Sequence, residues 1–304
     1  MVKAAALHTV TLRERQNREN LAGLAFLLPS LIGFVGFIVL PMLFSLYLSF
    51  HEWSMISGFK GIKFVGLENF RIMPGDVKFK IAMYNTLRYT ILTVPISIIL
   101  GLIIAVLIHD YVYGKNFIKI AVFLPYISSL VAITVVWKVL LNPTRGPVNM
   151  FLMTLGVQNP PGWFASTKWA IVGVSLETIW LTIGYNVVLY MAAFTGISSD
   201  LYDAASIDGC GGLRRVLYIT IPGAGPTTFF LTIMALINSF KVFDQVSIIQ
   251  AGSPSADASL VIAYQIYLQA FQYYKMGYAS AMSWVLFAII MVITLVQWHF
   301  DKSQ

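Results

Sequence analysis

Long apolar segments recur along this chain, and they restrict its fold more than any other feature. The hydrocarbon core of a bilayer is about 30 Å thick, and a helix of about 20 apolar residues crosses it. Six segments meet this length, at residues 22–50, 87–109, 118–141, 169–194, 224–247 and 277–299. The sequence therefore predicts an all-α integral membrane protein with six transmembrane helices. We expect residues 21–304 to form one transmembrane domain.

The composition agrees with a membrane protein. Hydrophobic residues make up 58% of the 304 residues and charged residues 11%, whereas soluble domains carry about 25% charged residues. The net charge of +7 comes from basic residues scattered between the apolar segments. This pattern indicates contact with anionic lipid headgroups, and we expect no nucleic acid as a partner.

Prolines occur inside three of the predicted spans. Pro29 and Pro41 lie in the first span, which we expect to be tilted or kinked. Pro95 and Pro125 lie in the second and third spans. Both prolines are tolerable there if neighbouring helices satisfy the carbonyl groups that a proline frees.

The first span sets the expected orientation. Arg13, Arg15 and Arg18 lie just before it, whereas its other flank has no basic residue until Lys60. Cytoplasmic flanks carry the excess of basic residues, and the first helix usually dominates. We therefore place residues 1–20 in the cytosol as an N-terminal tail, and six spans return the C-terminus to the same side.

Motifs of enzymes and metal sites are missing from the sequence. Cys210 is the single cysteine, which excludes an internal disulfide and a multi-cysteine metal site. The four histidines lie far apart, and no phosphate-binding loop or nucleophile elbow is present. We expect the chain to be no enzyme and to bind no metal and no cofactor.

Residues 195–222 interrupt the apolar pattern between the fourth and fifth spans. Ser198 can cap a short helix, and Ala204 and Ala205 leave little bulk on its surface. Gly209 suits the left-handed residue that ends a helix, and a second short helix would end at Pro222. On these residues alone, the segment is either a specific helical hairpin or a solvated connector.

This segment resembles the EAA signature of permease subunits from binding-protein-dependent ATP-binding cassette importers. The signature is Glu-Ala-Ala, then Gly after three residues and Ile-x-Leu-Pro after nine more. Asp203 replaces Glu and Ile221 replaces Leu, which keeps the charge sign and the apolar character. The matching positions are Asp203, Ala204, Ala205, Gly209, Ile219 and Pro222.

Other stretches resemble the carbohydrate branch of that family, the maltose-type and glycerol-phosphate-type permeases. The resemblance extends from about residue 20 to residue 300. The stretches are FVGLENF at 64–70, NTLRYT at 85–90, IDGCG at 207–211, FKVFDQV at 240–246 and MGYASAMS at 276–283. The resemblance implies a carbohydrate importer, although permeases for glycerol phosphate, phosphate, amino acids or polyamines share the signature.

The resemblance also implies an assembly. Residues 195–222 would be the coupling loop of a type I importer transmembrane domain, docked on a separate ATPase subunit. Two such ATPases would bind ATP and magnesium, and a second, distinct permease subunit would complete the pathway. An extracytoplasmic binding protein would deliver the solute to this complex in the cytoplasmic membrane of a prokaryote.

Polar and aromatic side chains within the fourth and fifth spans are candidates for the substrate pathway. Polar groups inside a span are costly in lipid and therefore face the protein interior. The candidates are Glu177, Trp180, Tyr185, Asn186, Asn238, Lys241 and Asp244. The competing interpretations are a structural ion pair for Lys241 and Asp244, and simple packing for Trp180 and Tyr185.

Two other functions are compatible with these residues. A secondary transporter would use Glu177, Lys241 and Asp244 as charge carriers, and it would work as a single chain on an ion gradient. A membrane-embedded enzyme is the least supported function, because no convergent acid–base set is present in the sequence.

Overall fold

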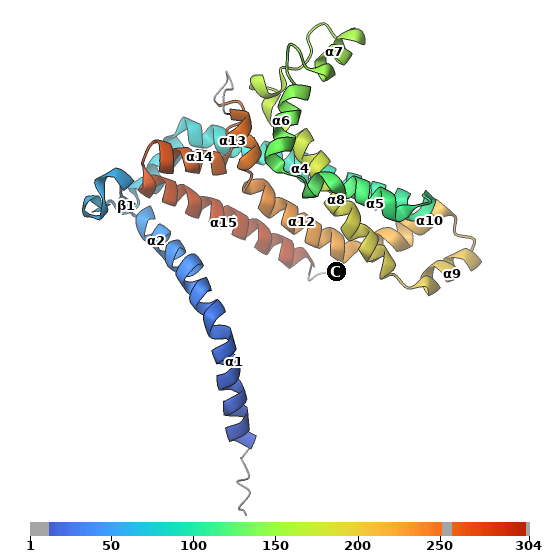
Figure 1. The fold of residues 1–304 in the computed structure, drawn as a ribbon, viewed down its shortest axis with the longest axis horizontal. Coiled ribbons are helices and arrows are strands. Elements are labelled where there is room, and N and C mark those ends of the chain that lie inside the picture. The colour runs from blue at the N-terminus through green and yellow to red at the C-terminus, as the bar shows by residue number, and fades with distance from the viewer. Residues whose placement is uncertain (1–11, 251–256, 302–304) are drawn as a thin grey trace, which may run out of the picture.

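The computed structural model describes residues 12–250 and 257–301, and most of them are helical. The first part of the predicted cytosolic tail, residues 1–11, lies outside the described residues. The long helices are α1 (Leu12–Phe34), α2 (Leu40–Ser49), α4 (Val77–Tyr111), α8 (Ala170–Thr195), α12 (Gly225–Phe240) and α15 (Met276–Asp301). Figure 1 shows them as a bundle from which α1 projects.

Short elements connect the long helices. The helical ones are α3 (Glu68–Ile72), α5 (Lys115–Ile127), α6 (Leu130–Leu140), α7 (Pro147–Thr154), α9 (Ser199–Ile207), α10 (Gly212–Arg215), α11 (Ile221–Gly223), α13 (Asp244–Gln250) and α14 (Ile262–Tyr267). Strand β1 (His51–Glu52) pairs antiparallel with β2 (Lys63–Phe64). Single 3-10 turns cover residues 55–57, 59–61, 73–75 and 163–165.

Five helical segments among the described residues are long and apolar enough to cross a membrane, and a bent helix pair can supply a sixth crossing. The second of these begins well before the predicted residue 87, because Asp76 caps α4 by accepting hydrogen bonds from the backbone N–H groups of Lys78 and Phe79. The fourth, Gly225–Gln250, is interrupted at residues 241–243, between α12 and α13.

The span predicted at residues 118–141 is a bent pair of helices rather than one helix. Helices α5 and α6 meet at an angle of 92°. Pro125 removes one helical donor in the last turn of α5. Ser128 and Ser129 then adopt extended backbone angles, and the Ser128 hydroxyl donates to the Leu124 carbonyl. The serine hydroxyl thus satisfies a carbonyl that the broken helix leaves free.

Two wide helical turns precede prolines. Val35–Val39 and Val216–Thr220 each form a π-helical turn, followed directly by Leu40-Pro41 and by Ile221-Pro222. A π-turn carries one more residue than an α-turn and leaves carbonyl groups outside the regular ladder. The chain therefore passes both prolines while staying helical, and the expectation that Pro222 ends its helix is wrong.

Close packing of α4, α5 and α8 forms the centre of the bundle. A Cβ atom on Gly184 of α8 would lie 2.1 Å from the Val122 carbonyl oxygen of α5, and one on Gly101 of α4 would lie 2.5 Å from Cβ of Asn186. Small residues at such positions let helix backbones approach closely in membranes. Helix α12 packs on α4, and α15 packs on α2.

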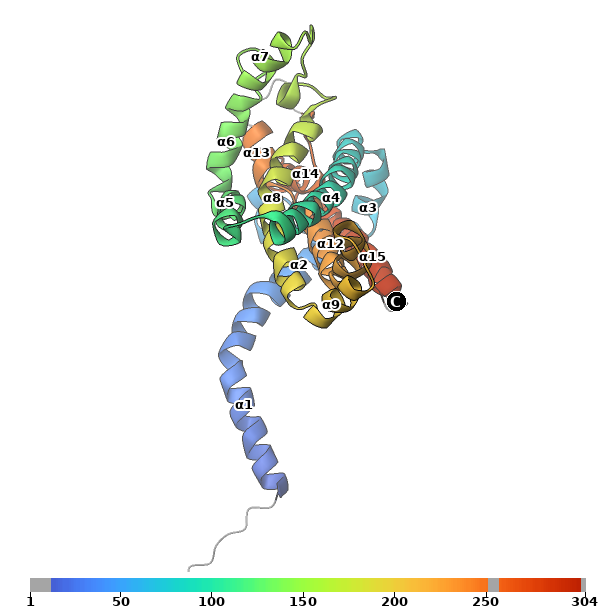
Figure 2. The ribbon, with the colours of Figure 1, turned by 90° about the vertical axis from the view of Figure 1, so that its right-hand side faces the viewer.

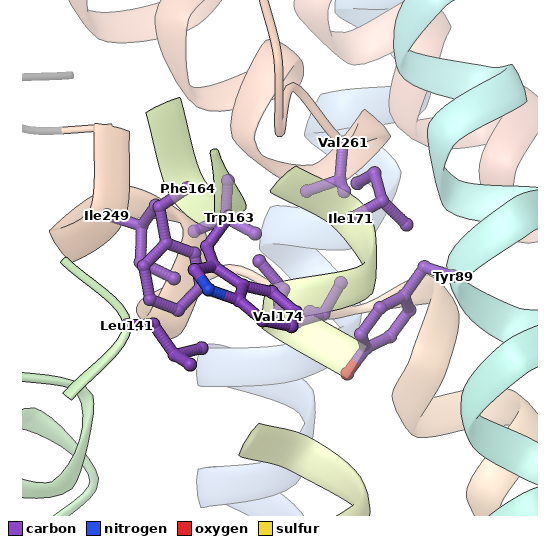
Figure 3. Close-up of a cluster of buried hydrophobic side chains, with 10 residues drawn as sticks. Tyr89, Leu141, Trp163, Phe164, Ile171, Val174, Ile249 and Val261 are labelled. Atoms are coloured by element: carbon purple, nitrogen blue, oxygen red, sulfur yellow. The ribbon is translucent and has the colours of Figure 1, made fainter. Parts of the chain in front are cut away.

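The connection between α6 and α8 folds back onto the start of α8. Trp163 and Phe164 are buried there with Leu141, Ile171 and Val174 in one apolar cluster. Figure 3 shows Trp163 on the same side of the cluster as Phe164 and Leu141, with Tyr89 of α4 on the opposite side. The Trp163 indole donates to Asn149 Oδ1 over 2.6 Å, so the ring satisfies its polar group within the cluster.

The connections alternate between two ends of the molecule. Strand β1, α7 and α13 lie toward one end, whereas α9 and α10 lie together at the other (Figure 1). Figure 2 also separates α7 from α9. This arrangement agrees with the expected alternation of loops on the two sides of a bilayer, while the side that faces the cytosol stays a prediction.

Candidate functional site

A cavity of about 410 Å³ lies where α4, α8 and α12 meet. The residues between α12 and α13 form one wall of the cavity. Tyr126 and Leu130 line it from either side of the α5–α6 bend. Interrupted helices thus contribute on two sides of the cavity. Binding sites in membrane transporters are often built at such interrupted helices.

Five of the seven predicted pathway residues line this cavity: Tyr185, Asn186, Asn238, Lys241 and Asp244. They come from α8, from α12 and from the segment that follows α12. Residues far apart in sequence therefore share one wall. Their role in transport stays a prediction.

Tyr185 and Asn186 occupy neighbouring positions on the cavity side of α8. The Tyr185 ring stacks on that of Tyr126, with centroids 4.8 Å apart. Asn186 is buried and donates from Nδ2 to the Ser97 carbonyl of α4 over 3.0 Å. The Tyr185 side chain therefore both packs and lines the cavity.

Trp180 does not line the cavity. Its side chain is 44% exposed, and its ring lies 5.9 Å from that of Trp137 of α6. Trp180 is on a different face of α8 from Tyr185, which is five residues further along the helix. This position agrees with packing between α6 and α8.

Glu177 is fully buried but lies outside the cavity lining. Its Oε1 atom accepts a hydrogen bond from the Thr134 hydroxyl of α6. Its Oε2 atom has no hydrogen-bond partner among the described residues. In this structure Glu177 therefore joins α6 to α8 rather than contacting the cavity.

Lys241 and Asp244 do not lie on one helix. Helix α12 ends at Phe240, and the Lys241 backbone N–H closes its last turn on the Asn238 carbonyl. Asp244 begins α13 after two non-helical residues, Val242 and Phe243. Although the structure describes both residues, it shows no ion pair between them. The polar groups of both side chains are available to a bound molecule.

Hydroxyl groups that the sequence reasoning missed complete the cavity wall. On α4 they recur at helical spacing, and each donates to its own backbone: Thr93 to the Tyr89 carbonyl and Ser97 to the Val94 carbonyl. On α8, Thr178 accepts from the Tyr89 hydroxyl over 3.0 Å and from Gln245 Nε2 over 3.2 Å. Hydroxyl residues in an apolar helix that recur every three or four positions lie on one face of that helix, and this spacing could have identified them from the sequence.

Residues 195–222 form the predicted helical hairpin. The Ser198 hydroxyl caps α9 by accepting from the Asp200 N–H over 3.3 Å. Gly209 has φ of +69°, and the following N–H, of Cys210, bonds to the Ala205 carbonyl over 2.8 Å. A left-handed glycine with this bond is a helix C-terminal motif. The Tyr202 and Thr220 hydroxyls, 3.0 Å apart, join the two arms.

The surface of this hairpin is open. Asp203, Ala204 and Gly209 are exposed, while Ala205 faces inward and is 9% exposed. Ile219 is half-buried and Pro222 is exposed. Three large apolar side chains around the same turn also lie open: Ile207, Leu213 and Tyr218. Large exposed apolar side chains mark a contact with another protein or with a membrane where they gather in one patch.

Comparison with known proteins decides the family. Residues 82–304 match the family described as binding-protein-dependent transport system inner membrane component. The chain belongs to this family. Its members are transport permeases rather than enzymes, and this permease is therefore a component of an inner-membrane transport system.

Individual relatives cover nearly the whole permease. It is 33% identical over 282 residues to the probable ABC transporter permease protein YesP of Bacillus subtilis, covering 92% of this chain and 90% of YesP. It is 30% identical over 286 residues to the lactose transport system permease protein LacF of Rhizobium radiobacter, covering 93% and 94%.

The fold of the permease also matches a solved structure. A bacterial ABC transporter involved in the import of the acidic polysaccharide alginate superposes with a TM-score of 0.82 at 24% identity, covering 95% of this chain and 98% of that one. The permease therefore has the fold of a type I importer transmembrane subunit.

Proposed function

We propose that this permease moves a carbohydrate, delivered by an extracytoplasmic binding protein, across the membrane in an ATP-driven importer. The observation that carries this proposal is the lining of the central cavity. Tyrosine rings, which suit the apolar faces of a sugar, stand beside hydroxyl and amide groups, which suit its hydroxyls. The name of LacF and the alginate importer's title support a carbohydrate.

The charges of the cavity favour an uncharged solute. Lys241 and Asp244 are the charged residues that line it, and their formal charges cancel. Glycerol phosphate, the alternative solute, carries a negative charge that this lining does not balance. A secondary transporter is less well supported, because Glu177, one of its three supposed charge carriers, lies outside the cavity.

The proposal includes partners that this chain requires. Two ATPase subunits bind ATP and magnesium, and one of them docks on the hairpin around Gly209. A second, distinct permease subunit completes the pathway. The complex lies in the cytoplasmic membrane of a prokaryote, with both termini of this chain in the cytosol. The exposed apolar side chains of the hairpin support the docking role.

Uptake of labelled sugars by proteoliposomes tests the function. The complete complex should accumulate a sugar when ATP is inside the vesicle and the binding protein is outside. Accumulation by this chain alone, driven by an ion gradient without ATP, would contradict the proposal.

Substitution of Gly209 tests the coupling segment. Gly209→Arg places a long charged side chain on an exposed turn where a Cβ meets nothing within 4 Å. We expect a folded, inserted subunit that no longer stimulates ATP hydrolysis or uptake. Gly114→Arg is the matched control, since Gly114 also has a positive φ, of 76°, and open surroundings. Normal stimulated hydrolysis in Gly209→Arg would show that the hairpin does not bind the ATPase.

A further inference from the structure

A second cavity, of about 550 Å³, lies on the other side of the molecule from the coupling hairpin. The segment from β1 to the start of α4 forms one wall, and the residues from Gln269 to Tyr278 form the other. A close backbone contact holds these walls together. A Cβ on Gly277 would lie 1.8 Å from the His51 carbonyl oxygen, so only glycine fits there.

The second cavity is acidic in a basic chain. Glu52, Glu68 and Asp76 line it with a single base, Lys275, and three carboxylates against one ammonium group leave a formal charge of −2. The whole chain carries +7. Glu52 and Glu68 are exposed, and the structure, which describes both, shows no ion pair or side-chain hydrogen bond for either. Both carboxylates are therefore free to accept from a bound molecule.

Asp76 contributes charge but few free lone pairs. Its Oδ1 atom accepts from the N–H groups of Lys78 and Phe79, and its Oδ2 atom accepts from the Tyr278 hydroxyl over 2.8 Å. These bonds fix its position at the start of α4. Asp76 therefore acts on a bound group mainly through the local electrostatic potential.

A buried acceptor also lines this cavity. Gln269 is 8% exposed and lies in the π-helical turn Leu268–Gln272. Its Oε1 atom has no hydrogen-bond donor within the described part of the chain. Buried polar atoms in proteins nearly always have a partner. The missing partner is a donor. The hydroxyl groups of Ser54 and Tyr274 and the ammonium group of Lys275 also line this cavity, but none of them bonds to this oxygen.

Aromatic rings complete the lining. Trp53 is held in place by a bond from its indole N–H to the Gly58 carbonyl, over 3.0 Å. Tyr274 and Tyr278 line the opposite wall. The faces of such rings attract cations. Rings, carboxylates and an unpaired amide oxygen together suit a positively charged group that carries N–H donors.

We propose that this cavity binds an organic cation with N–H donors, an alkylguanidinium or alkylammonium group. A guanidinium presents several donors in a planar fork, which matches several acceptors around one site. A neutral polyol would leave the excess negative charge uncompensated. Within the described residues no group of three or more acidic, histidine or cysteine side chains has the geometry to hold a metal ion.

The test measures binding of butylguanidinium to the co-purified complex in lipid nanodiscs, by saturation-transfer NMR titration. We expect saturable binding that Glu52→Gln and Glu68→Gln together weaken at least tenfold. Lys275→Met should tighten binding severalfold, because it removes the one positive charge. Tetramethylammonium, which has no N–H donor, should bind more weakly than butylguanidinium. Thermal unfolding of each variant checks that the fold is retained.

Asp110→Asn is the matched control, because it removes an exposed carboxylate elsewhere in the chain, at the end of α4. It should leave the affinity unchanged. Absence of saturable binding, equal weakening by Asp110→Asn, or weaker binding in Lys275→Met would each overturn the proposal.

A further arm distinguishes two sources of the cation. If butylguanidinium displaces the solute-binding protein from the complex, a basic side chain of that protein fills the cavity. If it binds without displacing that protein, the occupant is a free amine.

Discussion

The first span and the fourth span are both apolar helices, yet they lie in different surroundings. None of the most apolar stretch within Gly23–Ser49 is buried in the subunit, whereas 56% of the corresponding stretch of α8 is buried. Phe26 and Phe37 of the first span are 87% and 86% exposed. High hydropathy therefore identifies a span but does not tell which spans form the core.

The polar residues distinguish the two spans. Between Gly23 and Ser49 no charged residue occurs, while α8 carries Glu177 and Asn186, both buried. A polar group in a span needs protein around it, because lipid offers no partner. The buried helix can therefore carry polar side chains, and the exposed one faces lipid or the proposed second subunit.

The two spans should differ most in how much a Gly→Leu substitution destabilises the subunit. Gly184→Leu in α8 forces a side chain into the Val122 backbone of α5 and should destabilise the subunit by about 3 kcal/mol. Gly33→Leu in the first span, where a Cβ meets nothing within 4 Å, should be nearly neutral. Unfolding in mixed micelles measures both. Equal effects would show that α8 is no more tightly packed than the first span.

A smaller effect should follow from removing one buried hydrogen bond of α8. Thr134→Val takes the donor from Glu177 and leaves its carboxyl group without a partner, at a cost of about 2 kcal/mol. Thr294→Val, whose hydroxyl bonds only within α15, should cost much less. The double variant Thr134→Val/Glu177→Met should regain stability, since both polar groups are then absent. If the double variant is less stable than Thr134→Val, Glu177 stabilises the subunit by something other than its hydrogen bond with Thr134.

Transport kinetics separate the two faces of α8. Tyr185→Ala removes a ring from the cavity and should raise the KM for uptake about tenfold, which corresponds to about 1.4 kcal/mol. Trp180→Ala, on a face outside the cavity, should leave the KM unchanged. The opposite result would place the pathway on the α6 side of α8.

The smallest effect belongs to the first span. Phe37→Ala should change the unfolding free energy of the isolated subunit by less than about 0.5 kcal/mol, because the ring contacts lipid before and after unfolding. The same unfolding assay measures it. A loss of several kcal/mol would mean that the part of this span around Phe37, and not only α2, packs on the bundle.

Sequence reasoning found the spans because length and hydropathy are enough to identify them. It missed the bend at Ser128 and Ser129, since the local break depends on how serine hydroxyls satisfy freed carbonyls. It also missed the π-turns before Pro41 and Pro222, because the i-to-i+5 pattern has no clear sequence signature.

For the site, polar and aromatic residues in the fourth and fifth spans were the signal, and five of the seven line one cavity, while their role in transport stays a prediction. Glu177 and Trp180 fall outside it because their faces of α8 turn toward α6. The Thr and Ser hydroxyls were overlooked. Each can donate to a carbonyl group of its own helix, so such a residue does not by itself indicate a binding site. The acidic cavity was not foreseen, because Glu52 and Gln269 are brought together only by tertiary folding.

The wide turns before Pro41 and Pro222 have a genetic consequence. Each contains one residue more than an α-turn, so an in-frame deletion inside it would restore the regular ladder at the following proline, whose ring would then clash with a backbone carbonyl and kink the helix. Deleting Gly36 would kink a helix that is exposed on all sides, which the subunit should tolerate. Deleting Tyr218 would swing Asp203 and Ala204 away from whatever the hairpin contacts, so natural length variation should be found at the first turn and not at the second.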